Sequence, residues 1–377
     1  GESYTPAENV TAGGSAAESA QIAAQSAFNT EMSNVLAGLR SEASQMAAEG
    51  KELYETTGSA GFTGGSCWVN ELSVTSTYMT EEGLLSVVAE NYTYYGGAHP
   101  NSVSRTWSFD LTTGEFLTLD ALSSEEGDIN GDSLQTSIYQ NIVSQIDSQG
   151  LSEAYFDDYD SYLSDFPAFA TFYFTATGMT VAFDTYIIAP YAAGPQVFDV
   201  PYSVFYSALN ERAKTLLEVP QEQIVLSDFD TAATLWSWLF ITTPPTENTP
   251  DEMEINGYTY YQADIQGVST LADMRALMYR YFDKALADRW LEETERYAEA
   301  DGRLYVLSAD RGSNDSIMDE TCSVALDGES GTVTQTVTYG EWDEATQSWA
   351  ATGEETFAYP FTLVDGHAVF SAFPYPY

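Results

Sequence analysis

The chain has 377 residues, more than one compact hydrophobic core usually supports, so we expect two domains. Hydrophobic residues make up 44% of it and aromatic residues 14%, which excludes an intrinsically disordered chain. Its 57 acidic and 12 basic residues give a formal net charge of −45, which excludes nucleic acid as an expected partner because phosphates are repelled by such a field. The same charge would attract a cationic partner, although it also serves solubility outside a cell.

The N-terminal part begins with residues 1–15, which show no periodicity and are interpreted as the disordered remnant of a tether behind a removed signal peptide. Apolar residues then recur at helical spacing from Ala16 to Tyr54, which predicts one long amphipathic helix. No run of the sequence approaches the roughly 18 apolar residues of a membrane span.

A strand-rich region follows the helix. Alternating patterns and Gly-containing turns predict strands at 68–78, 84–92, 105–111, 169–174, 179–183 and 197–200, and a helix at 133–147. Residues Gln223 to Phe240, with Trp236 and Trp238, show no readable pattern and could close either domain.

Three prolines within residues 242–250 form the clearest linker, because proline stiffens the chain and donates no backbone hydrogen bond. We therefore expect a first domain at 16–242, a linker at 243–256 and a second domain at 257–377. In the second domain, Thr270 and Asp273 predict a capping box, and a further helix passes through Trp290. Strands are expected at 303–307, 321–326, 332–339, 356–363 and 368–373, with turns at 310–313, 327–328, 352–353 and 365–366. The fold class is α+β, with an antiparallel sheet packed against helices in each domain.

Signatures of catalysis are missing from the sequence, which contains no Gly-x-Ser-x-Gly, His-Glu-x-x-His or phosphate-binding loop. His99 and His367 are its only histidines, so a His-rich metal centre is excluded and we expect no metal and no cofactor. His99 could serve as a base, but a histidine that fixes its loop by hydrogen bonds is favoured. His367 follows a turn and is expected to be simply exposed.

Other polar groups leave alternatives open. Residues 128–132 place oxygen ligands at alternate positions, like part of a calcium loop, but they lack the distal glutamate, so a metal-free loop is favoured. Counting carboxylates leaves room for a glycosidase-like acid pair, which needs one raised pKa in a cleft. Cys67 and Cys322 could pair in an oxidising compartment, although two separate, mostly buried thiols are favoured because they belong to different expected domains.

Several motifs occur in the order of a known family: Tyr-Tyr-Gly-Gly-Ala-His-Pro at 94–100, Asp-Leu-Thr-Thr-Gly at 110–114, the hairpin at 172–183 and Ile-Ala-Pro-Tyr-Ala-Ala-Gly-Pro at 188–195. Through them, roughly residues 20–210 resemble the extracellular domain of lysozyme-sensing anti-sigma factors and the accessory region of peptidoglycan deacetylases, a DUF3298/DUF4163-like domain. Residues 257–377 resemble secreted inhibitors of bacterial D,L-endopeptidases, through 278–282, 301–313 and 364–370.

These resemblances imply a non-catalytic, exported cell-envelope protein, at the bacterial cell surface and lipid-anchored in its full-length precursor. It would bind a cell-wall hydrolase, such as a cationic lysozyme or a D,L-endopeptidase, or a peptidoglycan-related ligand. The expected contact residues are Tyr94, Tyr95, His99, Pro100, Tyr186, Tyr191, Asp310 and Arg311. The alternatives are a carboxylate-dependent peptidoglycan hydrolase or deacetylase, and a purely structural surface spacer.

Overall fold

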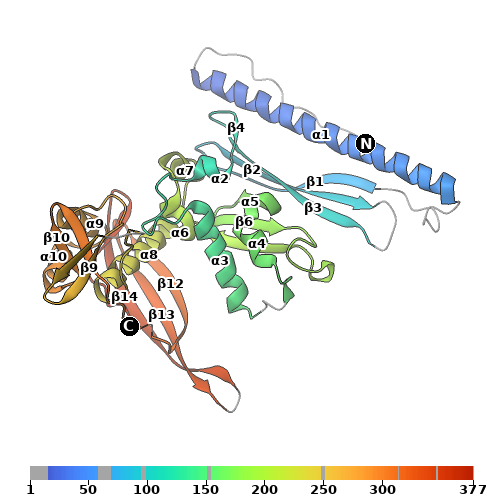
Figure 1. Cartoon of the computed structure of the whole chain (residues 1–377). Coiled ribbons are helices and arrows are strands. Elements are labelled where there is room, and N and C mark those ends of the chain that lie inside the picture. The colour runs from blue at the N-terminus through green and yellow to red at the C-terminus, as the bar shows by residue number, and fades with distance from the viewer. Residues whose placement is uncertain are drawn as a thin grey trace. The chain divides into compact units, whose positions relative to one another are not determined.

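A computed structural model describes residues 16–57, 69–94, 99–150, 154–247, 251–312, 314–344 and 347–376. The chain divides into two compact units. Unit 1 comprises Gly1–Ser123, Gln135–Pro201 and Asn210–Glu218, and unit 2 comprises Ser124–Leu134, Tyr202–Leu209 and Val219–Tyr377. Each unit combines antiparallel sheets with helices (Figure 1), which confirms the expected α+β class.

The two units are divided differently from the domains expected at 16–242 and 257–377. Residues 219–247 belong to unit 2, and short segments at 124–134 and 202–209 join them there. The cause is the segment that had no readable pattern: it forms helix α8 (Gln221–Phe240), whose Val225, Phe229 and Leu235 lie in the core cluster of unit 2.

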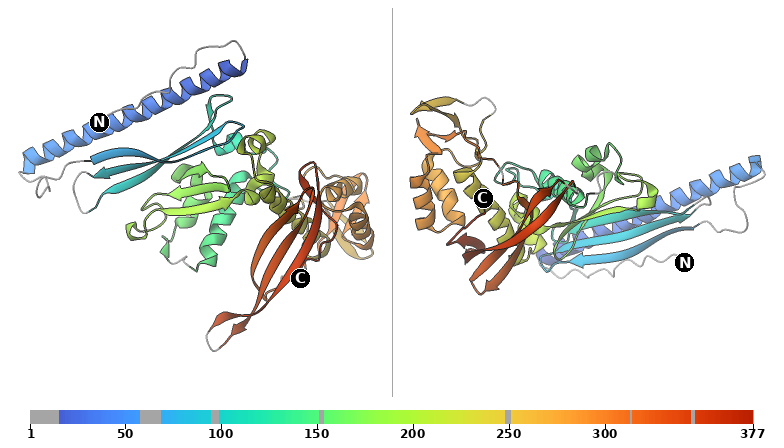
Figure 2. Two further views of the ribbon diagram at one scale, coloured as in Figure 1. Left: turned by 180° about the vertical axis from the view of Figure 1, so that it is seen from behind. Right: turned by 90° about the horizontal axis from the view of Figure 1, so that it is seen from below.

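In unit 1, the long expected helix is α1 (Ala16–Thr57), and it lies along a four-stranded antiparallel sheet (Figures 1 and 2). The strands are β1 (Val69–Met79), β2 (Leu84–Tyr94), β3 (Asn101–Asp110) and β4 (Glu115–Phe116), paired in that order. Phe28 of the helix meets Phe109 of β3 edge to face, with ring centroids 5.9 Å apart. Apolar side chains of helix and sheet, Met32, Val35 and Leu85 among them, line a cavity of about 750 Å³ between the two.

A second sheet of unit 1 carries the loop discussed below. It consists of β5 (Thr171–Phe174), β6 (Gly178–Phe183) and β7 (Gln196–Pro201), all antiparallel. Every residue of the central strand β6 is buried. The backbone N–H of Phe174 donates to Ser86 Oγ at 3.0 Å, which ties this sheet to β2. Helix α3 (Leu134–Ser148) presents Ile138, Ile142 and Ile146, all buried and spaced four residues apart as on one helix face. Short helical segments complete the unit: α2 (Leu119–Leu122), α4 (Tyr159–Ser164), α5 (Phe166–Phe169), η2 (Tyr191–Ala193) and α7 (Glu211–Leu217).

Unit 2 packs helices against two further antiparallel sheets. Besides α8 it contains α6 (Tyr202–Phe205), η3 (Tyr206–Ala208), α9 (Leu271–Tyr281) and α10 (Lys284–Glu293). The expected capping box is confirmed, because Thr270 Oγ1 accepts from the N–H of Asp273 while the Asp273 carboxylate accepts from the N–H of Thr270. One sheet has the order β10-β11-β9-β8, formed by Tyr297–Ala300, Arg303–Leu307, Tyr258–Gln262 and Glu252–Ile255.

The other sheet of unit 2 has the order β12-β13-β14-β15, formed by Ile317–Asp327, Ser330–Asp343, Ser348–Val364 and His367–Phe370. Along β13 the threonines stay partly exposed while Val333 and Val337 are fully buried, as expected for a strand with one solvated face. The turn expected at 352–353 is wrong, since both residues lie inside β14. Gly353 pairs with Tyr339 at a register shift, so the glycine marks a bulge.

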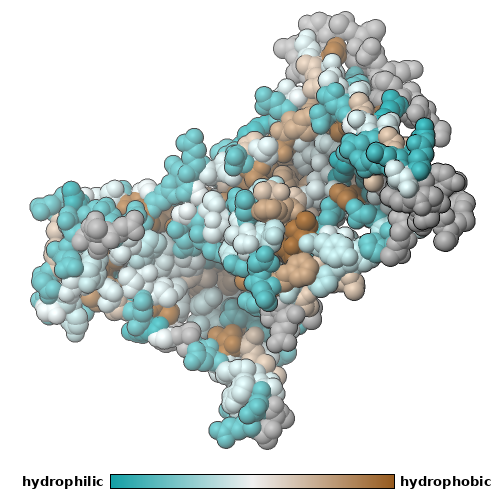
Figure 3. All heavy atoms as spheres, turned by 45° about the vertical axis from the view of Figure 1, so that its right-hand side comes forward, coloured by the Kyte–Doolittle hydropathy of each residue, from teal (hydrophilic) through white to brown (hydrophobic). Residues whose placement is uncertain are grey.

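The surface is mainly polar, as the composition requires. On the face seen in Figure 3, hydrophobic residues form separate patches among hydrophilic ones. Within the part of the chain that the structure describes, no helix is both long and apolar enough to cross a membrane.

Candidate functional site

Four of the expected contact residues come together on one surface of unit 1. His99 and Pro100 precede β3, whereas Tyr186 and Tyr191 belong to the loop between β6 and β7. The imidazole of His99 stacks on the ring of Tyr191 with a centroid distance of 3.8 Å and an angle of 25° between the planes. The ring of Tyr186 lies 5.5 Å from that of Tyr191, at 32°. We call Tyr186, Tyr191 and His99 the aromatic ladder.

Hydrogen bonds lock the ladder to the backbone before β3. The Tyr191 hydroxyl donates to the carbonyl oxygen of Pro100 at 2.9 Å, and His99 Nδ1 lies 3.0 Å from the same oxygen. A carbonyl oxygen can only accept, so Nδ1 carries the proton in this contact. His99 therefore fixes its own loop, in the way favoured from the sequence, while its side chain stays exposed.

The loop that carries both tyrosines is anchored to the rest of unit 1 by buried apolar residues and hydrogen bonds. Ile188 and Ala189 are buried, and the carbonyl oxygen of Ile188 accepts from the N–H of Phe156 at 3.0 Å. The Asp184 carboxylate accepts from the N–H of Ser104 in β3 at 2.9 Å. Burial raises the pKa of Asp184, with the Ser104 hydrogen bond and nearby Arg105 opposing the shift. The anchors hold the loop so that its tyrosines can project while its apolar residues fill the core.

Tyr186 adopts a backbone conformation that side-chain-bearing residues rarely take. Its φ is +70°, and its side chain is 58% exposed. A left-handed conformation costs a residue with a Cβ atom about 1–2 kcal/mol relative to the right-handed region. Tyr186 is thus an exposed tyrosine held in a conformation that glycine would adopt more easily.

The remaining expected contact residues are Tyr94, Tyr95, Asp310 and Arg311. Tyr94 is the half-buried last residue of β2, and Tyr95 lies outside the described residues. In unit 2, Asp310 accepts from both the N–H and the hydroxyl of Thr243, at 2.5 and 2.7 Å, and these bonds hold the pKa of Asp310 below its usual value. Asp310 thus serves the folding of the segment after α8. The Arg311 side chain makes no hydrogen bond or ion pair with a described residue.

Two expectations about individual residues are wrong. His367 is not simply exposed, because its Nδ1 lies 3.0 Å from Oδ1 of Asp228, a buried residue of α8, whose other carboxylate oxygen accepts from the N–H of Ala368. Cys322 is exposed on the edge strand β12, so it is not a buried thiol. Cys67 lies outside the described residues.

In the segment 128–132, which resembles part of a calcium loop, the carboxylate of Asp128 is hydrogen-bonded by the segment's own backbone. Asp128 Oδ1 accepts from the N–H groups of Asn130 and Asp132, at 2.8 and 2.9 Å. Burial raises the pKa of Asp128, although these hydrogen bonds oppose the shift. Among the residues whose placement is described, no three His, Cys, Asp or Glu side chains gather as they would around a metal ion.

The Asp-Leu-Thr-Thr-Gly motif has a structural role. Asp110 ends β3 and is buried, and its carboxylate accepts from the N–H and hydroxyl of Thr112, at 2.8 and 2.6 Å. Arg212 of α7 adds Nη2 at 2.8 Å and Nε at 3.2 Å to Asp110 Oδ2. The motif therefore joins the β3–β4 turn to α7.

Two family matches cover parts of the chain that lie mostly in unit 1. Residues 15–102 match the family described as "Deacetylase PdaC", and residues 128–203 match the "Protein of unknown function (DUF3298)" family. The ladder thus joins the two matched segments in space. His99 and Pro100 lie near the end of the first segment, and Tyr186 and Tyr191 lie inside the second. These matches confirm the DUF3298 part of the expected resemblance.

Solved structures of the same family give weaker likenesses. A DUF3298 family member from Bacteroides fragilis is 19% identical, with a TM-score of 0.32 over 50% of this chain and 70% of that one. A DUF3298 family protein from Pseudomonas aeruginosa is 16% identical, with a TM-score of 0.29 over 39% of this chain and 64% of that one, just under two thirds of its length. No curated protein matches the chain.

Proposed function

We propose that this chain is a non-catalytic, cell-wall-related protein of the bacterial envelope that binds a cationic cell-wall hydrolase, such as a lysozyme, through the aromatic ladder. The observation that carries the proposal is an exposed stack of three rings, held rigid by hydrogen bonds and by a strained Tyr186. Tyrosine suits protein interfaces because it offers a large rigid surface with a polar tip. The matched deacetylase and DUF3298 families support the cell-wall setting.

Charge supports a cationic partner. The chain carries a net charge of −45, so a protein of opposite sign would be drawn to it at a rate that falls as salt rises. Salt screens such long-range attraction beyond about 8 Å at physiological ionic strength. Binding that depends on the ladder would survive this screening, whereas attraction by charge alone would not.

The test is calorimetric titration with hen lysozyme and, separately, with a D,L-endopeptidase, at low and physiological salt, with hydrolase activity followed in parallel. A central interface tyrosine typically costs 2 kcal/mol or more when truncated, so Tyr186→Ala should weaken binding about 30-fold. Tyr258→Ala is the matched control, because Tyr258 is 59% exposed in unit 2. Equal affinities of the two variants for the hydrolase would refute the role of the ladder.

The strained backbone allows a second, independent check. Tyr186→Gly removes both the side chain and the cost of the positive φ, whereas Tyr186→Ala keeps the strain. We expect the glycine variant to match or exceed the thermal stability of the native chain while binding the hydrolase as weakly as the alanine variant. Lost stability in the glycine variant would contradict a tyrosine retained for contact.

A carboxylate-dependent hydrolase is the second candidate, favoured by one observation in unit 2. The surrounding protein desolvates the Asp230 carboxyl group and raises its pKa to about 7, and the charge of Glu320 adds to the shift, although the residue as a whole is exposed. An acid with such a pKa can donate a proton near neutral pH. Asp230→Asn should then abolish any peptidoglycan hydrolysis, and an unchanged rate, or none in the native chain, would dismiss this candidate.

A further inference from the structure

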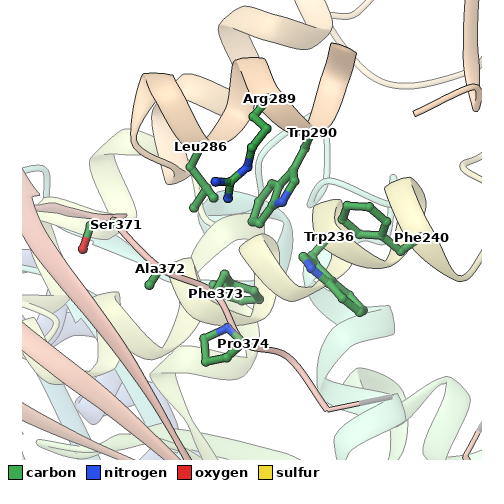
Figure 4. A pocket seen from close by; sticks show the side chains of 9 residues that line it. All are labelled: Trp236, Phe240, Leu286, Arg289, Trp290, Ser371, Ala372, Phe373 and Pro374. Carbon is green, nitrogen blue, oxygen red and sulfur yellow. The ribbon is translucent and has the colours of Figure 1, made fainter. Parts of the chain in front are cut away.

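Unit 2 contains a pocket with aromatic walls that none of the matched segments covers (Figure 4). Its volume is about 460 Å³, within the range of roughly 300–1,000 Å³ typical of small-molecule sites. Trp236 and Phe240 come from α8, Arg289 and Trp290 from α10, and Phe373 and Pro374 from the C-terminal segment. The matched families end at residue 203, so this pocket belongs to another part of the chain.

The walls are held in place by a network of ring contacts. The Phe240 ring lies 5.0 Å from Trp236 and 5.8 Å from Trp290, and Phe282 packs behind Trp290 at 5.1 Å. Phe373 meets the same Phe282 at 5.3 Å. Trp290 and Phe373 are buried members of the core of unit 2, so the pocket is formed before any ligand arrives.

The nitrogen-bearing side chains at the pocket, Arg289, Trp236 and Trp290, offer hydrogen-bond donors. Arg289 extends from α10 beside Trp290 (Figure 4), and within the described ranges its guanidinium makes no hydrogen bond or ion pair. The indole N–H groups of Trp236 and Trp290 likewise have no acceptor among the described residues. Asp288, the adjacent carboxylate, is already bound by Arg275 Nε at 3.1 Å and the Tyr279 hydroxyl at 2.6 Å.

We propose that this pocket binds a sugar acid of the muramic type: a pyranose ring that carries an acetamide and a carboxylate. Aromatic faces pack against the C–H face of such a ring, and a guanidinium pairs with a carboxylate through two parallel hydrogen bonds. The indole donors match the acetamide and hydroxyl oxygens. The choice of a cell-wall sugar rests on the cell-wall setting of the proposed function, whereas the demand for a ring with an anionic group comes from the pocket alone.

The net charge of the chain does not forbid this anionic ligand. At physiological ionic strength charges more than about 8 Å away are largely screened, so the local groups decide. The nearest exposed acids on the same helix are Glu292 and Glu293, three and four residues after Arg289, and neither forms an ion pair with it. An arginine that stays unpaired beside such neighbours remains available to a ligand.

The test uses the full chain, with N-acetylmuramic acid and N-acetylglucosamine as probes followed by calorimetry and tryptophan fluorescence. The two sugars differ by the lactyl group that holds the carboxylate, so their difference in affinity isolates the anionic contact. We expect saturable binding of the muramic sugar, at least 10-fold tighter than that of the neutral one. In Arg289→Gln the two affinities should become equal, whereas Arg280→Gln, which removes another exposed arginine of unit 2 that does not line the pocket, should change nothing.

The proposal is overturned if the muramic sugar shows no saturable binding, if both sugars bind equally to the native chain, or if the two arginine variants behave alike. Arg289→Gln should keep the native thermal midpoint, because the side chain has no described partner to lose. Tyr186→Ala should leave sugar binding intact, and Arg289→Gln should leave hydrolase binding intact. A failure at the pocket is therefore distinguishable from a failure at the aromatic ladder.

Discussion

The ion pair between Asp110 and Arg212 allows a quantitative prediction about the stability of unit 1. Asp110→Asn keeps the size of the side chain but removes its charge, and it turns one acceptor into a donor. The native carboxylate accepts two hydrogen bonds from Thr112 and the Nη2 and Nε donors of Arg212, with its own side chain only 5% exposed. An asparagine cannot satisfy both sets of donors, because its amide nitrogen must face one of them.

The magnitude follows from the exposure of the two partners. Breaking a buried ion pair by removing one charge costs about 3–5 kcal/mol. The Arg212 side chain is 46% exposed and can be rehydrated, so we expect a cost below that range, about 2–3 kcal/mol, at pH 7.

The pH dependence provides a second signature. Hydrogen bonds from Thr112 and Arg212 outweigh burial and lower the pKa of Asp110. A depressed carboxyl pKa contributes stability that is present above the unfolded value of about 4 and is lost as pH falls through the folded value. The difference between native chain and variant should therefore shrink as pH falls below about 4.

The assay is amide hydrogen exchange of β2 and β3, because it reports the opening of unit 1 separately from unit 2. Arg212→Ala and the double variant complete a mutant cycle, in which the two single effects should add to more than the double effect. A change under about 0.5 kcal/mol at pH 7, or one that does not vary with pH, would refute the argument.

Three further predictions concern packing and titration. Gly178→Ala should destabilise unit 1 by roughly 1–3 kcal/mol, because a Cβ atom there would overlap the carbonyl oxygen of Val200; unchanged exchange of β6 would contradict this. Asp230→Asn should stabilise unit 2 at pH 8, since the raised pKa of Asp230 means that folding opposes its ionisation, at a cost that grows between about pH 4 and 7 and is complete above pH 7. The gain in the free energy of unfolding should be roughly 1 kcal/mol, after allowance for the exposure of the residue, and should vanish towards pH 4. Urea unfolding at pH 8 and pH 4 measures it, and an equal gain at both pH values would contradict the reasoning. Cys322, in a Cys67→Ser background, should react with iodoacetamide at pH 8 at least about 100-fold more slowly than free cysteine. Although the residue as a whole is exposed, desolvation of its thiol and the charges of Asp230 and Glu320 raise the thiol pKa to about 12, and a rate close to that of the free amino acid would disprove this.

The sequence predicted secondary structure correctly where the apolar residues follow a single period, either that of a helix or that of a strand. The helix at α1, the strand β11 and the capping box at Thr270 follow directly from apolar spacing and cap chemistry. Helix α8 has no clear stripe because residues around most of its circumference are buried, Asp228 and Thr231 included, so neither period stands out. Gly353 was misread because glycine punctuates turns and bulges alike.

The candidate site was partly within reach of the sequence. Tyr186 and Tyr191 are close in the chain, but His99 lies near them only because β3 and β6 belong to sheets of the same unit. No local pattern predicts that proximity, and only the family motifs indicated that these residues belong to one surface. The pairing of His367 with Asp228 spans 139 residues and left no local signal. Arg289 was missed because a lone cation on a helix reads as part of a solvated face.

In a chain this acidic, the few basic residues are more informative about binding sites than the many acidic ones. With 57 acids, an unpaired carboxylate is expected almost anywhere and indicates little. The 12 basic residues are different, since carboxylates outnumber them and a partner is available to most. Arg212 fixes a turn to a helix, and the buried Arg296 donates to the carbonyl oxygens of Ile241 and Thr242, so these arginines stabilise the fold. An arginine that makes no such bond with a described residue, and that lies beside aromatic walls, is the stronger indication of a ligand, and Arg289 meets both conditions.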